Sequence, residues 1–203
     1  MKRKLSILLT AGMIMGATAL ASDNFAEQYK IVYGETEEIT RAEMAISLSN
    51  MLNMKNYEIA VPEEEKFTDV PETHPAYNAA NLIKQLGIAE GYGENIFGPE
   101  DRLTYEQAIK MLVCALGYNT VAMEKGGYPM GYISLASELG ITNGVDFIIT
   151  DNVTKENLTK LINNIANIPL MEKIGFGSNP EYAVMNGKDG NALMTFYDKY
   201  FGN

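Results

Sequence analysis

Apolar residues recur at helical spacing in two short segments that resemble each other. In Leu82–Ile88 and Leu135–Ile141, together with the residues just before them, the apolar side chains fall on one helical face, and a glycine follows that is suited to end a helix. A fainter copy lies at residues 25–34, where Lys30 stands in the place of the glycine. The pattern predicts three short amphipathic helices.

A longer helix is predicted after each short one. Thr40, Thr104 and Thr154 each precede an apolar stripe, and threonine is a favoured N-cap. Glu43 and Gln107 stand three residues after the first two threonines, which is typical of a capping box, whereas the third helix keeps only the cap. The stripes consist of Met44, Leu48, Met51 and Leu52; of Ala108, Ile109, Leu112 and Leu116; and of Leu158, Leu161, Ile162 and Ile165. These stripes predict three long helices that share one core.

The chain therefore divides into three helix-loop-helix units at about residues 23–54, 67–118 and 126–168, with an acidic linker at 62–65. A unit of this size cannot bury its apolar face alone. We expect a mainly α fold in which residues 22–171 form one pseudo-threefold domain.

The pattern of apolar and turn-forming residues changes after Pro169. Glu181–Met185 and Ala192–Tyr197 flank the turn-forming residues 186–191, and this arrangement favours a short β-hairpin within a C-terminal extension at 172–203. An isolated hairpin is marginally stable, so we expect it to dock on the helices or to pair with a protein partner.

The N-terminus is typical of a secretory leader. A basic start, Met1–Lys4, precedes an apolar run and a small-x-small site at Ala19–Ala21, so residues 1–21 are predicted to be removed on export. A retained N-terminal anchor is the alternative. We expect a secreted protein associated with the cell wall or cell surface, without a membrane span after leader removal.

Charge and composition exclude several function classes. Removing residues 1–21 takes away three basic residues and no acidic one, so the formal net charge moves from −10 to −13, which repels nucleic acid and anionic membranes. One histidine, His74, and one cysteine, Cys114, cannot build a His/Cys zinc site. We expect no catalysis, no cofactor and no metal. Only Arg41 and Arg102 remain as arginines, so each is informative.

Several motifs together resemble the S-layer homology (SLH) repeat. They are Phe67–Pro71, Gly87–Ile88, Gly91–Tyr92, Phe97–Pro99 and Leu103–Thr104. Ile39–Glu43 is similar to the ITRAE motif of that family, and Tyr105–Tyr118 with Gly126–Pro129 is similar to a clostridial-type variant. The resemblance covers about residues 25–171. It implies three tandem repeats in a three-pronged helical bundle that binds secondary polymers of Gram-positive cell walls.

The resemblance also implies ligand-binding residues. In the family, grooves between repeats use the motif arginine with the aspartate of the FxD motif, and these correspond here to Arg41 and Asp69. The chain departs from the family pattern because it lacks tryptophan and has Tyr105 and Lys155 at the other two arginine positions. Lys155 could contact an anion as a point charge, and Arg102 could replace the charge missing at Tyr105.

Two interpretations of the first motif remain open. A guanidinium at the first position of a capped helix could grip the carboxylate or phosphate oxygens of a pyruvylated or otherwise anionic polysaccharide. Alternatively, Thr40 and Glu43 form only a capping box and Arg41 is solvated. The leading expectation is non-catalytic attachment to such a polymer, with Arg41, Thr40, Glu43, Asp69, Lys155 and Arg102 as candidate contacts. The alternative is a structural or protein-interaction module that has lost most glycan binding.

Overall fold

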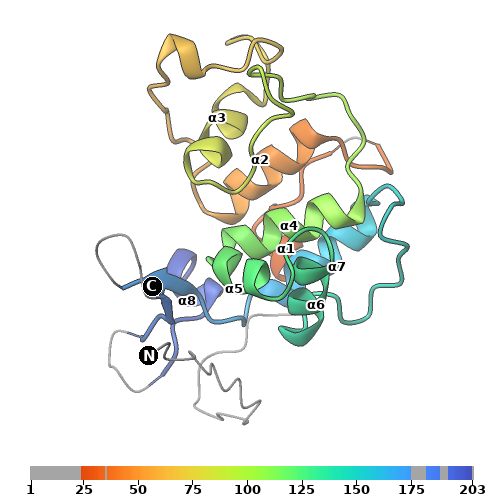
Figure 1. The fold of residues 1–203 in the computed structure, drawn as a ribbon, viewed down its shortest axis with the longest axis vertical. Coiled ribbons are helices and arrows are strands. Elements are labelled where there is room, and N and C mark those ends of the chain that lie inside the picture. The colour runs from red at the N-terminus through yellow and green to blue at the C-terminus, as the bar shows by residue number, and fades with distance from the viewer. Residues whose placement is uncertain (1–23, 35, 175–181, 188–191, 203) are drawn as a thin grey trace.

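The computed structural model describes residues 24–34, 36–174, 182–187 and 192–202. Within these ranges the chain is mainly helical, with a two-stranded antiparallel sheet near the C-terminus (Figure 1), which confirms the expected fold class. The predicted leader, residues 1–21, lies outside the described residues.

The described helices follow the predicted alternation of short and long elements. The short helices are α1 (Phe25–Gln28), α3 (Tyr77–Gln85) and α6 (Met130–Glu138), and the long helices are α2 (Arg41–Met51), α4 (Tyr105–Ala115) and α7 (Lys155–Ile165). The remaining elements are a 3₁₀ helix η1 (Glu63–Glu65), α5 (Asn119–Glu124), β1 (Met171–Lys173), β2 (Tyr182–Val184) and α8 (Phe196–Tyr200). The acidic linker thus carries a 3₁₀ turn.

The short helices end in the same way. Lys30, Gly87 and Gly140 take left-handed backbone conformations with φ of 51°, 65° and 81°. The N–H of the residue that follows each of them donates to a carbonyl five residues earlier, over 2.8 to 2.9 Å. This is the hydrogen bond of a Schellman end, and it explains why glycine occupies two of the three positions. Lys30 adopts the same conformation at a steric cost.

We expect Lys30→Gly to stabilise the protein by about 0.5–1 kcal/mol, because glycine removes the left-handed strain and loses part of that gain as unfolded-state entropy. Urea unfolding measures the change. Lys55→Gly is the control, because Lys55 is exposed and its φ is not positive, so this variant should be neutral or slightly destabilising. Equal effects of the two substitutions would contradict the strain at Lys30.

Threonine N-caps begin the long helices, as predicted. Thr40 accepts from the Glu43 N–H while the Glu43 carboxylate accepts from the Thr40 N–H at 2.9 Å. At Thr154 only the Asn157 N–H bond is present, so the third helix has a cap without a box. Most of the apolar stripes behind these caps have no exposed surface, including Met44, Leu48, Met51, Ala108, Ile109, Leu112, Leu116, Leu158, Leu161, Ile162 and Ile165.

A closed ring of backbone hydrogen bonds joins the three loops that precede these helices. Ile39 N–H donates to Val153 C=O, Val153 N–H to Leu103 C=O, and Leu103 N–H to Ile39 C=O, over 2.8 to 2.9 Å. The three side chains are fully buried. In a second layer, N–H groups two residues after the ring positions donate to carbonyls two residues before them, in the opposite order around the ring: from Arg41 to Asp101, from Tyr105 to Asp151 and from Lys155 to Glu37. The loops are therefore related by pseudo-threefold symmetry, and the helix N-termini meet at one ring.

The C-terminal pairing is antiparallel as expected, but its strands differ from the expected pair. β2 pairs with β1, with Met171 opposite Val184, and not with Ala192–Tyr197. From the latter segment, Leu193 forms an isolated bridge with Asn186, and helix α8 begins after Thr195. The physical reason is the N-cap, because Thr195 and Asp198 form a capping box that starts a helix where an apolar strand was predicted.

Candidate ligand-binding grooves

The first residue of each long helix reaches into a neighbouring unit. The Arg41 guanidinium lies over the ring of Phe97, the Tyr105 ring stacks on Phe147 with centroids 5.0 Å apart, and the Lys155 Nζ donates to the Gly34 carbonyl at 2.6 Å. Three different side chains thus join adjacent units from equivalent positions. This shared position explains how tyrosine and lysine replace the motif arginine without loss of the fold.

Arg41 is buried, with 4% of its surface exposed. Its Nε donates to the Phe97 carbonyl at 2.8 Å and its Nη2 to the Glu90 carbonyl at 3.4 Å, while the guanidinium carbon lies 4.5 Å from the ring centroid of Tyr92. Burial lowers the pKa of the Arg41 guanidinium, and Tyr92 and the carboxylates of Asp101 and Asp69 oppose that shift. Arg41 is therefore a buried cation, and two of its guanidinium nitrogens donate to backbone carbonyls.

Asp69 holds the loop that Arg41 contacts. One carboxylate oxygen accepts from the Phe97 N–H at 2.8 Å and the other from the Gly98 N–H at 2.7 Å. Since the Phe97 carbonyl of the same loop receives the Arg41 bond, Asp69 positions Arg41 indirectly. Both oxygens have protein partners, so the structure gives Asp69 a positioning role.

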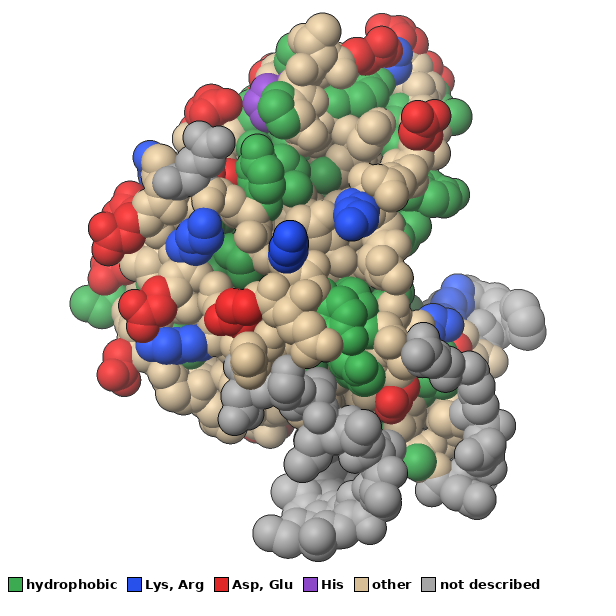
Figure 2. All heavy atoms as spheres, turned by 180° about the vertical axis from the view of Figure 1, so that it is seen from behind, with side chains coloured by type: hydrophobic (Ala, Val, Ile, Leu, Met, Phe, Trp, Pro, Cys, Tyr) green, Lys and Arg blue, Asp and Glu red, His purple; other side chains and the backbone are tan. Residues whose placement is uncertain are grey.

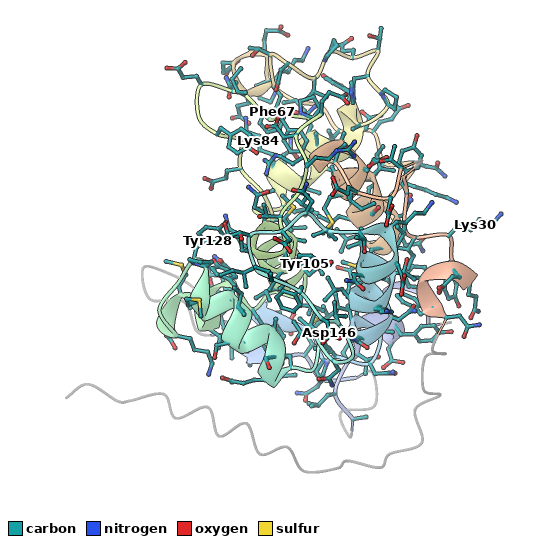
Figure 3. All side chains as sticks on the ribbon, turned by 90° about the vertical axis from the view of Figure 1, so that its right-hand side faces the viewer. Lys30, Phe67, Lys84, Tyr105, Tyr128 and Asp146 are labelled. Atoms are coloured by element: carbon teal, nitrogen blue, oxygen red, sulfur yellow. The ribbon has the colours of Figure 1, made fainter. Side chains whose placement is uncertain are left out.

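A cavity of about 180 Å³ opens beside Arg41, and we call it the Arg41 groove. Its lining combines Arg41, residues 88–92, Gln107, Lys110, Met111 and Tyr128. Tyr92 is 56% and Tyr128 48% exposed, so both rings present surface to solvent. Tyr128 lies beside α4, below the α2–α3 part of the molecule (Figure 3), and its hydroxyl donates to Glu106 Oε1 at 2.9 Å. The Lys110 ammonium lies 6.0 Å from the centre of the Tyr128 ring.

A second cavity of about 420 Å³, the Arg102 groove, lies between the first and second units. Its lining includes Thr40, Glu43 and Ile46 from α2 and its cap, His74 and Pro75, and Tyr33, Thr36, Ala42, Glu100 and Arg102. The Arg102 guanidinium donates to the Glu38 carbonyl at 2.6 Å and to Thr36 Oγ1 at 3.1 Å. This groove carries two carboxylates beside its arginine.

The two grooves occupy equivalent places in the pseudo-threefold fold. Glu43 and Ile46 stand three and six residues after the capping Thr40, and Gln107 and Lys110 stand at the same distances from Thr104. Each groove also contains the residue before a proline at the start of the next unit, His74 in one and Tyr128 in the other. The chemical difference is that Lys110 faces one groove where Ile46 faces the other.

The structure distributes the predicted site residues over separate places. Arg41 lines one groove, Thr40, Glu43 and Arg102 line the other, and neither lining contains Asp69 or Lys155. Sequence reasoning did not select Tyr92, Tyr128 or Lys110 as site residues. The available signal was the helical position of Lys110 and the glycine-rich context of both tyrosines, but their proximity depends on how the units pack.

Charge is unevenly distributed over the surface. On the face opposite that of Figure 1, several basic side chains lie across the middle, and many acidic side chains lie toward the edges (Figure 2). Among the residues that the structure describes, no helix has the length and apolar character needed to cross a membrane.

Helical units that meet at a threefold ring, with grooves between them, define a modular helical fold, and comparisons with known proteins show what it is similar to. Residues 66–109 match the S-layer homology domain family. The chain is 29% identical over 143 residues to a "Cell surface protein" of Thermoanaerobacter kivui, covering 70% of this chain and 18% of that protein. It is 30% identical over 169 residues to a "Middle cell wall protein" of Brevibacillus brevis, covering 82% of this chain and 15% of that protein.

A "Surface layer protein" of Brevibacillus choshinensis is 29% identical over 169 residues, covering 82% of this chain and 14% of that protein. The chain thus spans less than a fifth of each of these relatives. The chain carries an S-layer homology domain at residues 66–109 and is a protein of the cell surface or cell wall.

Proposed function

We propose that the chain is a non-catalytic module that attaches to an anionic secondary cell-wall polysaccharide, and that the Arg41 groove is its principal ligand site. We further infer three SLH-type repeats at 23–54, 67–118 and 126–168. The polymer would carry a pyruvate ketal, a phosphate or another anionic substituent.

The observation that carries this proposal is the composition of the Arg41 groove. It places two cationic side chains, Arg41 and Lys110, beside two exposed tyrosine rings in a chain whose net charge is strongly negative. Sites for small ligands combine apolar walls with a few convergent polar groups. Tyrosine rings can cover the apolar face of a sugar while cations select an acidic substituent.

The two cations have different parts in this proposal. Arg41 is buried and bonded to backbone carbonyls, so it supplies positive potential from the floor of the groove. Lys110 is more exposed than Arg41 and its ammonium group can follow an anion as a mobile point charge. We propose that Lys110 makes the direct ionic contact and that Tyr92 and Tyr128 form the walls.

The Arg102 groove is proposed as a weaker site for the same polymer. Glu43 and Glu100 lie in its lining and repel an anionic substituent, and Arg102 forms an ion pair with Glu38 at 3.9 Å. Thr40 and Arg102 could still donate to neutral hydroxyls. Lys155 donates a hydrogen bond to the Gly34 carbonyl, and its proposed role is mainly to link the third unit to the first.

Co-sedimentation with native cell-wall sacculi, beside sacculi stripped of secondary polymer, tests the proposal. Wild-type protein should pellet only with native sacculi, and added salt should weaken binding because it screens the charges. Lys110→Gln should raise the dissociation constant about tenfold, the value of one charge-assisted contact, and Tyr92→Ala should also weaken binding.

Matched controls exist for both variants. Lys160 occupies in α7 the position of Lys110 in α4, and Tyr57 is 53% exposed and lies outside both grooves. Lys160→Gln and Tyr57→Ala should leave binding unchanged. Equal binding by the Lys110 variant and wild type would show that the ionic contact is assigned to the wrong residue, and failure of folded wild type to bind native sacculi would overturn the function.

One observation favours a second candidate, a structural or protein-interaction module with little glycan binding. The Arg41 guanidinium already donates to two backbone carbonyls. Tyr105, at the position of a second motif arginine, stacks on Phe147. This candidate predicts that the folded protein pellets with neither kind of sacculus and that a protein partner retains it at the surface. Zymography on wall substrate tests the absence of catalysis in both candidates.

A further inference from the structure

The C-terminal segment contains a second closed ring of backbone hydrogen bonds. Leu170 N–H donates to Met194 C=O, Met194 N–H to Met185 C=O, and Met185 N–H to Leu170 C=O, over 2.8 to 2.9 Å. Three stretches of chain from one short segment thus meet around a threefold arrangement.

This ring reproduces the ring of Ile39, Leu103 and Val153 in direction and in register. In both, the first position in the chain donates to the third, the third to the second and the second to the first. The bridges also correspond, with Pro169–Thr195, Met171–Val184 and Asn186–Leu193 in place of Glu38–Thr154, Thr40–Arg102 and Thr104–Asn152, respectively.

The correspondence extends into the helix that follows. Thr195 stands one residue after its ring position, as Thr40 does, and begins α8 with a capping box to Asp198. The N–H groups of Phe196 and Tyr197 donate to Ile168 and Ala166 carbonyls, two and four residues before the ring residue Leu170. Arg41 and Ala42 donate to the equivalent carbonyls of the first ring, Asp101 and Pro99. Among the described residues, Met194 is the only residue of the second ring that is followed by a helix, α8.

The groove position of α8 is filled from within the chain. Six residues after the capping threonine stands Phe201, where α4 has Lys110 and α2 has Ile46. The Phe201 ring lies 4.3 Å from the centroid of Tyr29 and 5.1 Å from that of Phe25, both in or next to α1. The Tyr29 and Tyr197 hydroxyls are hydrogen-bonded at 3.2 Å. Phe25 and Phe196 are 1% and 0% exposed.

We propose that the described parts of this segment, residues 168–174, 182–187 and 192–202, form a reduced fourth unit of the fold, and that its groove is an internal docking site for the aromatic helix α1. The first position of α8 is Phe196 where the first unit has Arg41, so an aromatic ring that packs against Phe25 stands in place of a cation. The C-terminal segment thereby clamps the first helix of the described chain to the last. This proposal does not depend on glycan binding.

The clamp also ties the ends of the long helices. Asn53, just after α2, donates to the Tyr200 carbonyl at 3.1 Å, and Tyr118, just after α4, donates through its hydroxyl to the Pro169 carbonyl at 3.0 Å. The backbone N–H of Tyr197 donates to the carbonyl of Ala166, just after α7. The first ring joins the helix N-termini, and the fourth unit contacts their C-terminal ends.

Amide hydrogen exchange on the full chain tests the clamp. Phe201→Ala should speed exchange of the α1 and Ile31 amides roughly two- to tenfold, the range expected for loss of one aromatic pair, while amides in the middle of α4 keep wild-type rates. Tyr29→Ala should do the same, and the double variant should be less than additive because the two rings contact each other. Phe201→Leu, which keeps apolar volume without stacking, should give a smaller increase.

Tyr57→Ala, an exposed tyrosine outside the cluster, is the control and should leave α1 exchange unchanged. The proposal is overturned if α1 exchange in Phe201→Ala and Phe201→Leu equals wild type, or if α1 and α4 accelerate together, since α1 would then open only with the whole fold. Binding to sacculi, measured in parallel, should remain at the wild-type level.

Discussion

Replacing Asp69 with alanine should lower the free energy of unfolding by about 3 kcal/mol, because it removes the acceptor of two backbone N–H groups on a buried loop. Phe97 is fully buried, so water cannot replace the carboxylate at its N–H without a rearrangement. The same loop presents the Phe97 carbonyl to Arg41, and we therefore expect the Arg41 groove to lose its order and the variant to lose wall binding. Urea unfolding and co-sedimentation measure the two effects.

Two variants make the Asp69 experiment specific. Asp69→Asn keeps one carbonyl acceptor and should lie between alanine and wild type. Asp146 is exposed, and Asp146→Ala should change stability by less than about 0.5 kcal/mol. If Asp69→Ala unfolds within 1 kcal/mol of wild type, the value expected for a single ordinary hydrogen bond, the loop does not depend on this carboxylate.

Gly117→Ala should be at least as destabilising, by about 3 kcal/mol or more, because it combines backbone strain with overlap against a backbone atom. Gly117 has φ of 85°, and a Cβ atom there would lie 2.0 Å from the Met171 carbonyl oxygen. Met171 also donates its N–H to the Leu116 carbonyl at 3.0 Å, so the C-terminal segment docks directly on the end of α4. Thermal unfolding should show a large loss.

Gly87→Ala distinguishes the effect of backbone strain from that of the overlap with Met171. Gly87 also has a positive φ of 65°, but a Cβ atom there meets nothing within 4 Å. It should therefore carry only the left-handed strain, about 1 kcal/mol. If Gly117→Ala costs no more than Gly87→Ala, the close approach of Met171 to α4 does not contribute to stability.

These predictions connect the proposed binding site to the architecture. The Arg41 groove is built from three units at once, so substitutions far from its surface, such as those at Asp69, should act on binding through the loops that line it. The exposed residues Tyr92 and Lys110 should instead alter binding with little loss of stability. Comparing stability with binding for each variant therefore distinguishes positioning residues from residues that contact the polymer.

The sequence by itself determined the local elements. Helical spacing of apolar residues, threonine caps at Thr40, Thr104 and Thr154, and the glycines Gly87 and Gly140 placed the long and short helices close to where they lie. These signals act over one or two helical turns, so neighbouring residues are enough to define them. The order and spacing of the motifs also led to the SLH family.

Only the tertiary structure decided which residues meet across units. Arg41 was expected to face ligand or solvent, and it is buried because the Phe97 loop folds over it. Ala192–Tyr197 was expected as a strand, and its second half is a capped helix held against α1 and α7. Such contacts depend on the register of the backbone rings and on the packing of segments that are distant in the sequence, and no local pattern of residues encodes them.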